Sequence, residues 1–404
     1  MVACLYALLD RSSLLVVITR FDIMRLTSCA LCNGQFGSEG VIHSREHLIP
    51  NSIGGSKKVF GILCKTCNDR TGAEWDAILA DQLSFVSVTV NVKRDRGTHP
   101  AVDAVTRSGQ SIRLYADGHL TQPRTPPIET AENGGIRVTG RVSTIKEAHV
   151  LFRGLKRKFP KFDEAGAIDR LKLEKTYISE PVVGAVYIHG NASGRSIVKS
   201  AYVLAVHAGV MPENCELARD YLLGNDNTFC WWFYYERDLI ANRPRTHLFH
   251  CVAVSGNPIT RQLLGYVEFF GAYRMLVLLS SEYDGKALFS CYAIDPTTGQ
   301  ELTIWPNLDL TIDEVISTCN GERHYAEGMS AAINQLMTIA YPKTFERERE
   351  RVIAEAVRAA ISQLGLAPDE EIGPEGAAEL VRLVMAEITP CILHQARALR
   401  EPIK

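Results

Sequence analysis

The alternation of apolar and polar residues predicts more strand than helix in the middle of the chain. Residues 84–92 alternate with period two and predict a strand. A hairpin is expected at Ile112–Tyr115, with its turn at residues 116–118. Five further apolar segments predict strands: Val182–His189, Thr246–Val254, Leu264–Phe270, Arg274–Ser280 and Ala287–Ile294. Between the first two of these segments, helices are expected at 194–208 and about 213–223. Together they predict an α+β fold, with a mixed domain around a mainly antiparallel sheet.

Helical signals flank this region on both sides. The pattern Thr144-x-x-Glu147 predicts a capping box that opens a helix ending near Lys158. The proline-rich and glycine-rich segment 122–135 before it is expected to be a linker or exposed loop. In the last hundred residues, helices are predicted at Lys343–Leu364 and about Gly376–Ile388, and Pro390 is expected to break the second one before a final helix.

The patterns divide the chain into four parts. We expect an N-terminal extension at 1–23, a small cysteine-containing module at 24–83, the mixed α+β domain at 84–305, and a helical C-terminal region at 306–404. The sequence leaves open whether Met1 or Met24 is the true start. Because no segment resembles a signal peptide or approaches ~20 apolar residues, no membrane association and a cytoplasmic location are expected.

Composition excludes several classes of protein. The 404 residues are 46% hydrophobic and 22% charged, which is typical of a globular chain rather than a disordered one or a coiled-coil rod. The net charge is only −2, so any nucleic-acid binding must come from a local basic face. The sequence has no Walker loop, G-x-G-x-x-G or G-x-S-x-G motif, which argues against a nucleotide-driven motor and a serine hydrolase.

Two cysteine pairs predict a structural zinc site. Cys29 and Cys32 form one C-x2-C pair, Cys64 and Cys67 form another, and 31 residues separate the pairs. Two such turns direct four thiolates at one point, which is the closed tetrahedral arrangement of structural Zn2+ sites. The other seven cysteines are solitary, and core positions explain them more simply.

The residues between and after these pairs resemble the HNH endonuclease family. The sequence reads CALC, then REHLIPNSIGG, then LCKTCNDRTG, so an acid-His pair, a Gly-Gly pair and both cysteine pairs occur in the family's order. The resemblance is to the subgroup with a four-cysteine zinc site. It covers about residues 24–83, which we call the zinc module.

The resemblance implies a metal-dependent phosphodiesterase in which a β-hairpin carries the acid-His pair and the following helix carries another ligand. By position, His47 is the general base, while Glu46 and Asn68 bind the catalytic divalent cation, Mg2+ or Mn2+. The residue types agree, because imidazole is suited to deprotonate water near neutral pH and hard cations prefer oxygen ligands.

Two positions depart from the family pattern. Asn68 stands where a last histidine is usual, although an amide oxygen can still bind a hard cation. The family's middle asparagine has no match at 59–63, and Asn51 is the nearest candidate, either to hold the hairpin or to orient His47. His43 is more simply a surface residue of the hairpin.

The sequence offers candidate contacts for nucleic acid, expected to be DNA rather than RNA. The strongest basic patch lies at the end of the predicted helix near Lys158, although a solvated helix terminus is a slightly simpler interpretation. This first patch consists of Arg153, Lys156, Arg157 and Lys158. Arg195 and Lys199 form a second candidate, for which a surface turn is the simpler interpretation.

Two other clusters have simpler structural interpretations. The pair His247 and His250 would point to opposite faces of a strand, so core or edge positions are favoured over a metal site. The aromatic run 231–235 could stack on bases, but a buried strand is the simpler interpretation.

The functional expectation is therefore an HNH endonuclease, and a non-catalytic, zinc-stapled nucleic-acid-binding protein is the alternative. The resemblance also suggests a restriction or anti-phage defence context. There the large α+β domain would sense an unidentified activating ligand or partner protein. A homodimer would favour double-strand cleavage over nicking.

Overall fold

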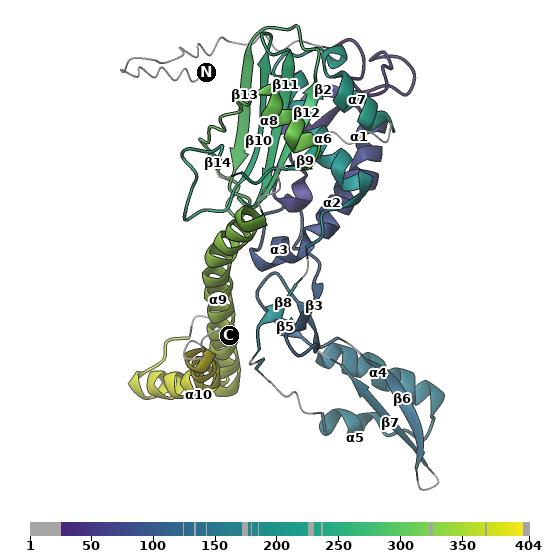
Figure 1. Cartoon of the computed structure of the whole chain (residues 1–404). Helices are drawn as coiled ribbons and strands as arrows, with labels where there is room; N and C mark the ends of the chain where they lie inside the picture. The colour runs from purple at the N-terminus through teal and green to yellow at the C-terminus, as the bar shows by residue number, and fades with distance from the viewer. Residues whose placement is uncertain are drawn as a thin grey trace.

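The computed structural model describes residues 26–123, 125–132, 135–142, 144–171, 177–178, 180–184, 186–224, 230–235, 237–322, 326–367 and 370–398. The predicted extension at 1–23 lies outside these residues. In Figure 1 a body built on one large sheet carries two projections, a pair of long helices and an arm of small sheets and helices. No helix in the described ranges combines the length and apolar character that crossing a bilayer requires.

The sheet of the body has six antiparallel strands in the order β14-β13-β10-β11-β12-β9. Every residue of β11 is buried, as expected for a central strand covered on both faces. Four of the five predicted strands correspond to sheet strands here, whereas the described part of Val182–His189 contributes the two-residue β8 (Val182–Val183) of another sheet. The strands are β9 (Cys230–Trp232), β10 (His250–Asn257), β11 (Gln262–Phe269), β12 (Tyr273–Ser280), β13 (Leu288–Ile294) and β14 (Glu301–Leu302).

Helix α6 (Gly190–His207) joins the sheet to the zinc module. Its side chains are buried almost without interruption from Ser196 to Val206, because one side packs on β10–β12 and another on the zinc module. Gly265 of β11 allows the close approach, since a Cβ there would lie 2.7 Å from the Cβ of Ala201. The zinc module, α6 and one face of the sheet therefore share a single hydrophobic core.

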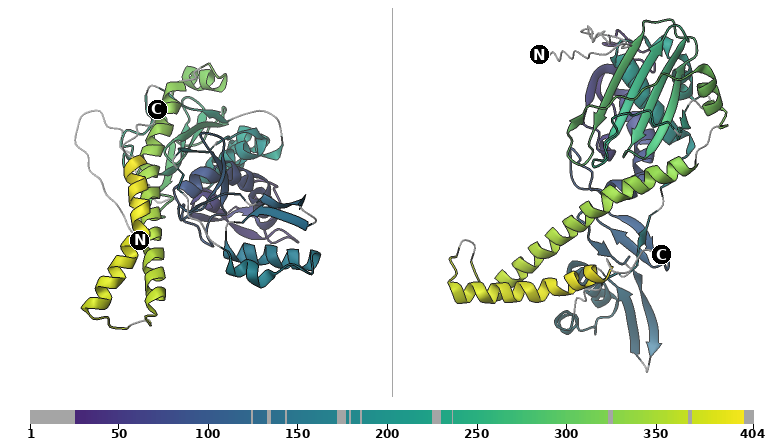
Figure 2. Two further views of the ribbon diagram at one scale, coloured as in Figure 1. Left: turned by 90° about the horizontal axis from the view of Figure 1, so that it is seen from below. Right: turned by 60° about the vertical axis from the view of Figure 1, so that its left-hand side comes forward.

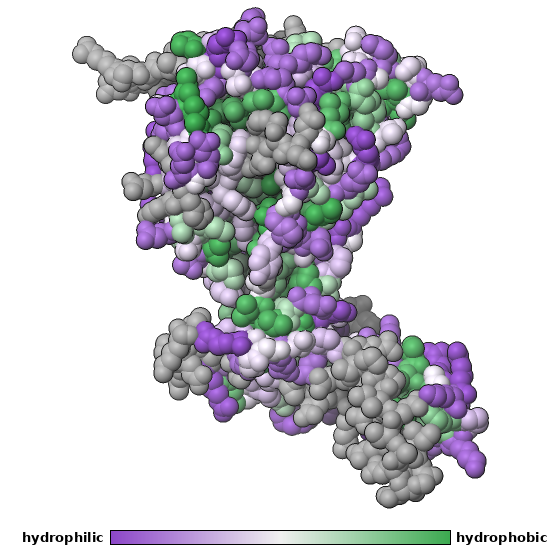
Figure 3. Space-filling model, turned by 45° about the vertical axis from the view of Figure 1, so that its right-hand side comes forward, coloured by the Kyte–Doolittle hydropathy of each residue, from purple (hydrophilic) through white to green (hydrophobic). Residues whose placement is uncertain are grey.

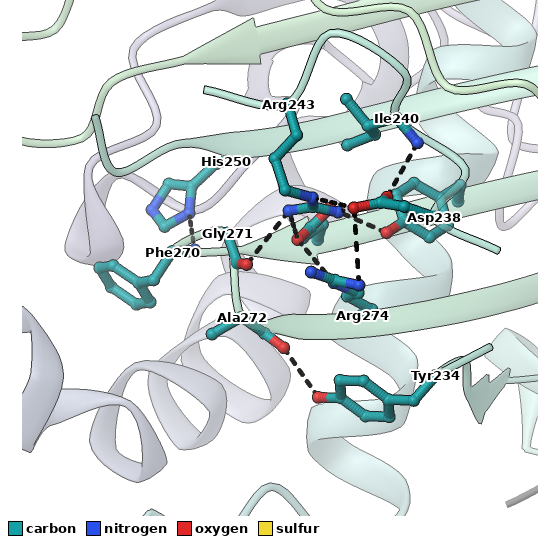
Figure 4. A network of polar contacts seen from close by, with 11 residues as sticks. Tyr234, Asp238, Ile240, Arg243, His250, Phe270, Gly271, Ala272 and Arg274 are labelled. Atoms are coloured by element: carbon teal, nitrogen blue, oxygen red, sulfur yellow. Dashed lines mark hydrogen bonds and ion pairs between the residues drawn. The ribbon is translucent and has the colours of Figure 1, made fainter. Parts of the chain in front are cut away.

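The other face of the sheet is covered by α8 (Ile312–Cys319) and by irregular segments around residues 237–249 and 303–311. A buried polar network lies between this face of the sheet and the segment around residues 237–249 (Figure 4). Glu268 is fully buried and is paired with Arg243 at 2.6 Å and with Arg274 at 3.1 Å. Asp238 also pairs with Arg243, so the buried charges are compensated.

His250 links this region to the zinc module. Its ring is fully buried, and Nδ1 accepts a hydrogen bond from the Phe270 N–H (3.0 Å), as Figure 4 shows. Nε2 must then carry the proton, which it donates to the Ile53 carbonyl at 2.6 Å. Burial lowers the pKa of His250 to about 4, so the ring is neutral near pH 7. The core position expected for this histidine is confirmed, and His247 is 60% exposed.

The arm runs from Lys93 to Ile188 and contains two sheets. The first has the order β5-β4-β3-β8, built from β3 (Val102–Thr106), β4 (Ser111–Leu114) and β5 (Leu120–Thr121), so the expected hairpin and its turn at Gly118 are confirmed. The second is a ribbon of β6 (Thr125–Glu132) and β7 (Gly135–Arg141). Helices α4 (Ile145–Lys158) and α5 (Glu164–Asp169) follow, and Thr144 caps α4 by accepting the Glu147 N–H.

The ribbon corrects the expectation of a linker at 122–135. The prolines that suggested a loop lie at residues 126 and 127, where the register of β6 against β7 is irregular. In a two-stranded ribbon both strands are edges, and an edge strand tolerates a residue that cannot donate to the ladder. The sequence signal for a break thus marks an irregularity within a strand.

Residues 84–92 do not form the predicted strand. Ser84–Thr89 is a short helix, α3, that directly continues α2 (Ala77–Gln82). Val86 of α3 and Val90, just after the helix, are buried in the core of the body. The Thr89 hydroxyl donates to the Phe85 carbonyl one turn earlier at 2.7 Å. Burial against the body has outweighed the strand preference of the valines.

Two long helices form the C-terminal region (Figure 2). α9 (Ala326–Leu364) leaves the body and α10 (Pro374–Ala398) folds back along it. The expected break at Pro390 is wrong, because α10 continues through this residue; a proline removes only one donor of a long ladder. Where α9 leaves the body, the Thr344 hydroxyl donates to the Thr89 carbonyl at 2.8 Å.

The surface in Figure 3 shows hydrophilic residues outlining the body, with hydrophobic ones in separate small groups. The aromatic run 231–235 contributes Phe233 and Tyr234 to the core, as the simpler interpretation expected. The fold is therefore a mixed helix and antiparallel-sheet body in which the zinc module is built into the main core.

Candidate active site and zinc centre

The zinc module is a hairpin followed by a helix. Strands β1 (His43–His47) and β2 (Lys58–Cys64) are antiparallel, and α1 (Lys65–Thr71) starts directly after β2. A π-helical turn at Gly72–Asp76 then leads into α2. This is the order of elements that the resemblance implied, with Glu46 and His47 on the first strand and Asn68 on the helix.

The Gly-Gly pair has a steric explanation. Gly54 has a left-handed φ of 102°, and Gly55 has no room for a side chain, because a Cβ would lie 1.9 Å from the Ile49 carbonyl oxygen. The Asn51 side chain closes the same turn by donating to the Gly55 carbonyl at 2.9 Å. Asn51 also accepts the Asp95 N–H at 3.3 Å. In this structure Asn51 holds the turn after β1 and makes no hydrogen bond to His47.

The four paired cysteines lie together. The Sγ atoms of Cys29, Cys32, Cys64 and Cys67 are all within 4.8 Å of one another. Two of these sulfurs accept backbone N–H groups: Cys29 from Cys64 at 3.2 Å, and Cys64 from Cys67 at 3.4 Å. Four thiols converging from two turns form a donor set that could bind a structural zinc ion.

Glu46 points into the protein rather than toward solvent. It is 2% exposed, and its Oε1 accepts a hydrogen bond from the Lys199 ammonium of α6 at 2.6 Å. Lys199, itself 1% exposed, also donates to Asp76 at 2.6 Å, and Asp76 accepts from the Ser196 hydroxyl at 2.6 Å. Among the described residues, Glu46 Oε2 is buried and has no hydrogen-bond partner.

The pKa values in this cluster follow from burial and charge. Burial raises the pKa of Glu46, and the neighbouring ammonium of Lys199 partly offsets this effect. Burial would lower the pKa of Lys199, but the carboxylates of Asp76 and Glu46 outweigh it and raise the value. Lys199 therefore remains an ammonium ion that partly neutralises two carboxylates.

His47 lies on the opposite side of β1, and its side chain is partly exposed although its Nε2 atom is buried. Its Nε2 is 3.7 Å from Asp95, which is an ion-pair distance and too long for a hydrogen bond, so within the described chain this nitrogen has no hydrogen-bond partner. Burial and the charge of Lys58 lower the pKa of His47, while Asp95 opposes the shift. The imidazole is therefore neutral at neutral pH and able to accept a proton.

Asn68 faces the hairpin from α1. Its Nδ2 donates to the carbonyl of Arg45, the neighbour of Glu46, at 3.0 Å, which leaves Oδ1 as the atom for a ligand. Across the described residues, no hydrogen bond joins the side chains of Glu46, His47 and Asn68 directly. Glu46 and His47 are neighbours on β1 with side chains on opposite sides of the strand, and the Asn68 amide is tied to the same strand through the Arg45 carbonyl.

Three residues near the site escaped the sequence analysis: Asp76, Ser196 and Asp95. A fourth, Lys199, was considered only as a surface cation, and this is wrong because it is buried against two carboxylates. Its partner Arg195 lies against the Tyr221 ring and donates to the Tyr221 carbonyl at 3.2 Å. A lysine inside an apolar helix was the one available signal, since such a charge needs a partner.

The basic patch lies far along the chain from this site, at the end of α4. Its four cations are exposed, and the Lys156 ammonium donates to the Phe162 carbonyl at 2.7 Å. The cations are Arg153, Lys156, Arg157 and Lys158.

Comparison with known proteins identifies the zinc module alone. A family model described as HNH endonuclease matches residues 27–84. No curated protein and no solved structure matches the chain significantly. The match spans the cysteine cluster, the β1–β2 hairpin and the helices up to the start of α3, so it confirms the resemblance for this segment.

Proposed function

We propose that the chain is a metal-dependent endonuclease that hydrolyses phosphodiester bonds of DNA, with the zinc module as its active site. The observation that carries the proposal is the placement of Glu46, His47 and Asn68 on a hairpin and helix within the HNH endonuclease match. The cysteine cluster would staple the module structurally.

Each residue has a role that its surroundings support. Glu46 and Asn68 would hold Mg2+ or Mn2+ through Oε2 and Oδ1, and the buried, unpartnered Oε2 fits such a ligand. The bound cation would offset the negative charge that develops on the phosphate. His47 would take the proton from the attacking water through its unpartnered Nε2, and Asp95 would stabilise the imidazolium that results.

The test uses supercoiled plasmid with Mg2+ or Mn2+ and the full chain. The wild type should convert the plasmid to nicked or linear forms, and His47→Ala should lower the rate by about 10²–10⁴-fold, the usual contribution of a general base. His43→Ala is the matched control, because this exposed histidine of the same strand stacks on Phe36 and has no proposed role. Full activity of His47→Ala would refute the mechanism.

The exposed cations of α4 favour a second candidate, a nucleic-acid-binding protein without catalysis. This candidate function predicts that replacing all four cations with glutamine weakens DNA binding and reduces the dependence of the affinity on salt concentration. It also predicts that the wild type does not cleave DNA with any divalent metal ion. If the endonuclease reading is correct, the same surface would position the substrate for the zinc module. Plasmid cleavage by the wild type would exclude the second candidate.

A further inference from the structure

A chain of polar contacts connects α6 to Glu46. The Ser196 hydroxyl donates to Asp76 Oδ1, the Lys199 ammonium donates to Asp76 Oδ2, and it also donates to Glu46 Oε1, each at 2.6 Å. Ser196 and Lys199 lie outside the segment that matches the HNH family, on a helix that begins more than a hundred residues later. The module therefore depends on a distant helix for the environment of its buried acid.

The two oxygens of Glu46 have different surroundings. Oε1 is fixed by Lys199, whereas Oε2 is buried and, within the described part of the chain, has no hydrogen-bond partner. A buried carboxylate oxygen without a partner is costly unless something binds it. With both carboxyl groups ionised, Glu46, Asp76 and the Lys199 ammonium would carry one net negative charge, which would favour a cation at Oε2.

We propose that Lys199 is a positioning residue, which holds Glu46 by one oxygen so that the other is presented to the catalytic cation. The inference rests on the proposed function, because it assigns Glu46 as a metal ligand. Carboxylates that bind metals are commonly fixed by hydrogen bonds from a second layer of residues, and loss of that layer typically weakens metal affinity about 10–100-fold. In this protein the second layer is Lys199, with Asp76 and Ser196 behind it.

The test measures Mn2+ binding to the full chain by electron paramagnetic resonance, in parallel with the thermal unfolding midpoint. Glu46→Gln defines the binding that depends on this carboxylate. Lys199→Met, similar in length but without charge, should weaken that binding by about 10–100-fold. Ser200→Ala is the matched control, because Ser200 is buried one turn after Ser196 on α6, and among the described residues its hydroxyl donates to the Ser196 carbonyl of its own helix and takes no part in the contacts of Glu46 and Asp76. The control should bind Mn2+ like the wild type.

A milder variant covers the case in which Lys199→Met does not fold. Ser196→Ala removes only the outer end of the chain of contacts and should weaken Mn2+ binding in the same direction by a smaller factor. Unchanged affinity in the folded variants would assign Lys199 a purely structural role and overturn the inference.

Two further outcomes would also overturn it. Stronger Mn2+ binding by Lys199→Met would mean that the ammonium competes with the cation, and a wild type without Glu46-dependent binding would remove Glu46 as a ligand. Plasmid cleavage is scored separately. A wild type that binds Mn2+ through Glu46 but cuts nothing refutes the proposed function and leaves the role of Lys199 standing.

Discussion

Replacing His250 with phenylalanine should destabilise the whole body, although the two rings are similar in size. The imidazole satisfies two buried backbone groups at once: the Ile53 carbonyl of the zinc module and the Phe270 N–H of the sheet. Phenylalanine fills the space but bonds neither group. Leaving a buried polar group unsatisfied costs about 1–3 kcal/mol, so the free energy of unfolding should fall by about 2–6 kcal/mol.

The pH dependence of this effect gives a sharper test. Because the pKa of folded His250, about 4, lies below the ordinary 6.5, the unfolded chain takes up the proton more readily. The stabilisation by His250 is therefore complete above pH 6.5 and is lost progressively as the pH falls toward 4. The loss amounts to about 3 kcal/mol, since one pKa unit corresponds to about 1.4 kcal/mol.

Urea unfolding followed by tryptophan fluorescence at pH 7.5 and pH 4.5 measures both effects. The stability difference between wild type and His250→Phe should be large at pH 7.5 and clearly smaller at pH 4.5, because only the wild type carries this titration. The matched control is His43→Phe, at an exposed position of β1 where the ring stacks on Phe36, which should change stability little at either pH. An equal difference for His250→Phe at both pH values would refute the reasoning.

Three further predictions concern the zinc module and the arm. Gly55→Ala should lower the thermal unfolding midpoint by several degrees, because the new Cβ would overlap the Ile49 carbonyl; a midpoint equal to that of the wild type would show that the turn can yield. Gly154→Ala, at an open position of α4, should instead leave the arm equally stable or up to about 1 kcal/mol more stable, measured by urea unfolding. Metal analysis of the wild type should find one equivalent of zinc, and Cys64→Ser should abolish it and make the zinc module sensitive to proteolysis. The control Cys391→Ser, at a buried solitary thiol, should keep the zinc content of the wild type.

The parts of the site that the sequence predicted are local. Cys29 and Cys32 lie on one turn, Glu46 and His47 are adjacent on one strand, and Asn68 follows the second cysteine pair directly. Short spacings of this kind determine geometry before any tertiary packing. The contact between Lys199 and Glu46 spans 153 positions and depends on how α6 packs, so no local pattern could specify it.

The errors in predicted secondary structure have two different origins. The valines of 84–90 alternate as in a strand, yet burial against the body makes the segment helical, so tertiary packing outweighed a correct local preference. The proline pair at 126–127 suggested a loop, but the irregular edge strand β6 accommodates it, because an edge strand need not donate at every residue.

The arm leaves and rejoins the body at fixed anchors. It starts at Lys93, whose N–H donates to the Pro296 carbonyl, and it ends before His189, whose N–H and carbonyl both pair with the Gln82 side chain. Among the described residues between these anchors, none contributes to the Glu46–Asp76–Lys199 cluster, while Asp95, two residues after the first anchor, lies beside His47. Helix α6, which supplies Lys199, begins at once after the second anchor. In evolutionary terms the unit that holds this cluster is thus discontinuous: residues 26–95 and α6 must be inherited together. The part of the arm beyond Asp95 can be lengthened, exchanged or lost as an insertion while Glu46 and His47 keep these neighbours.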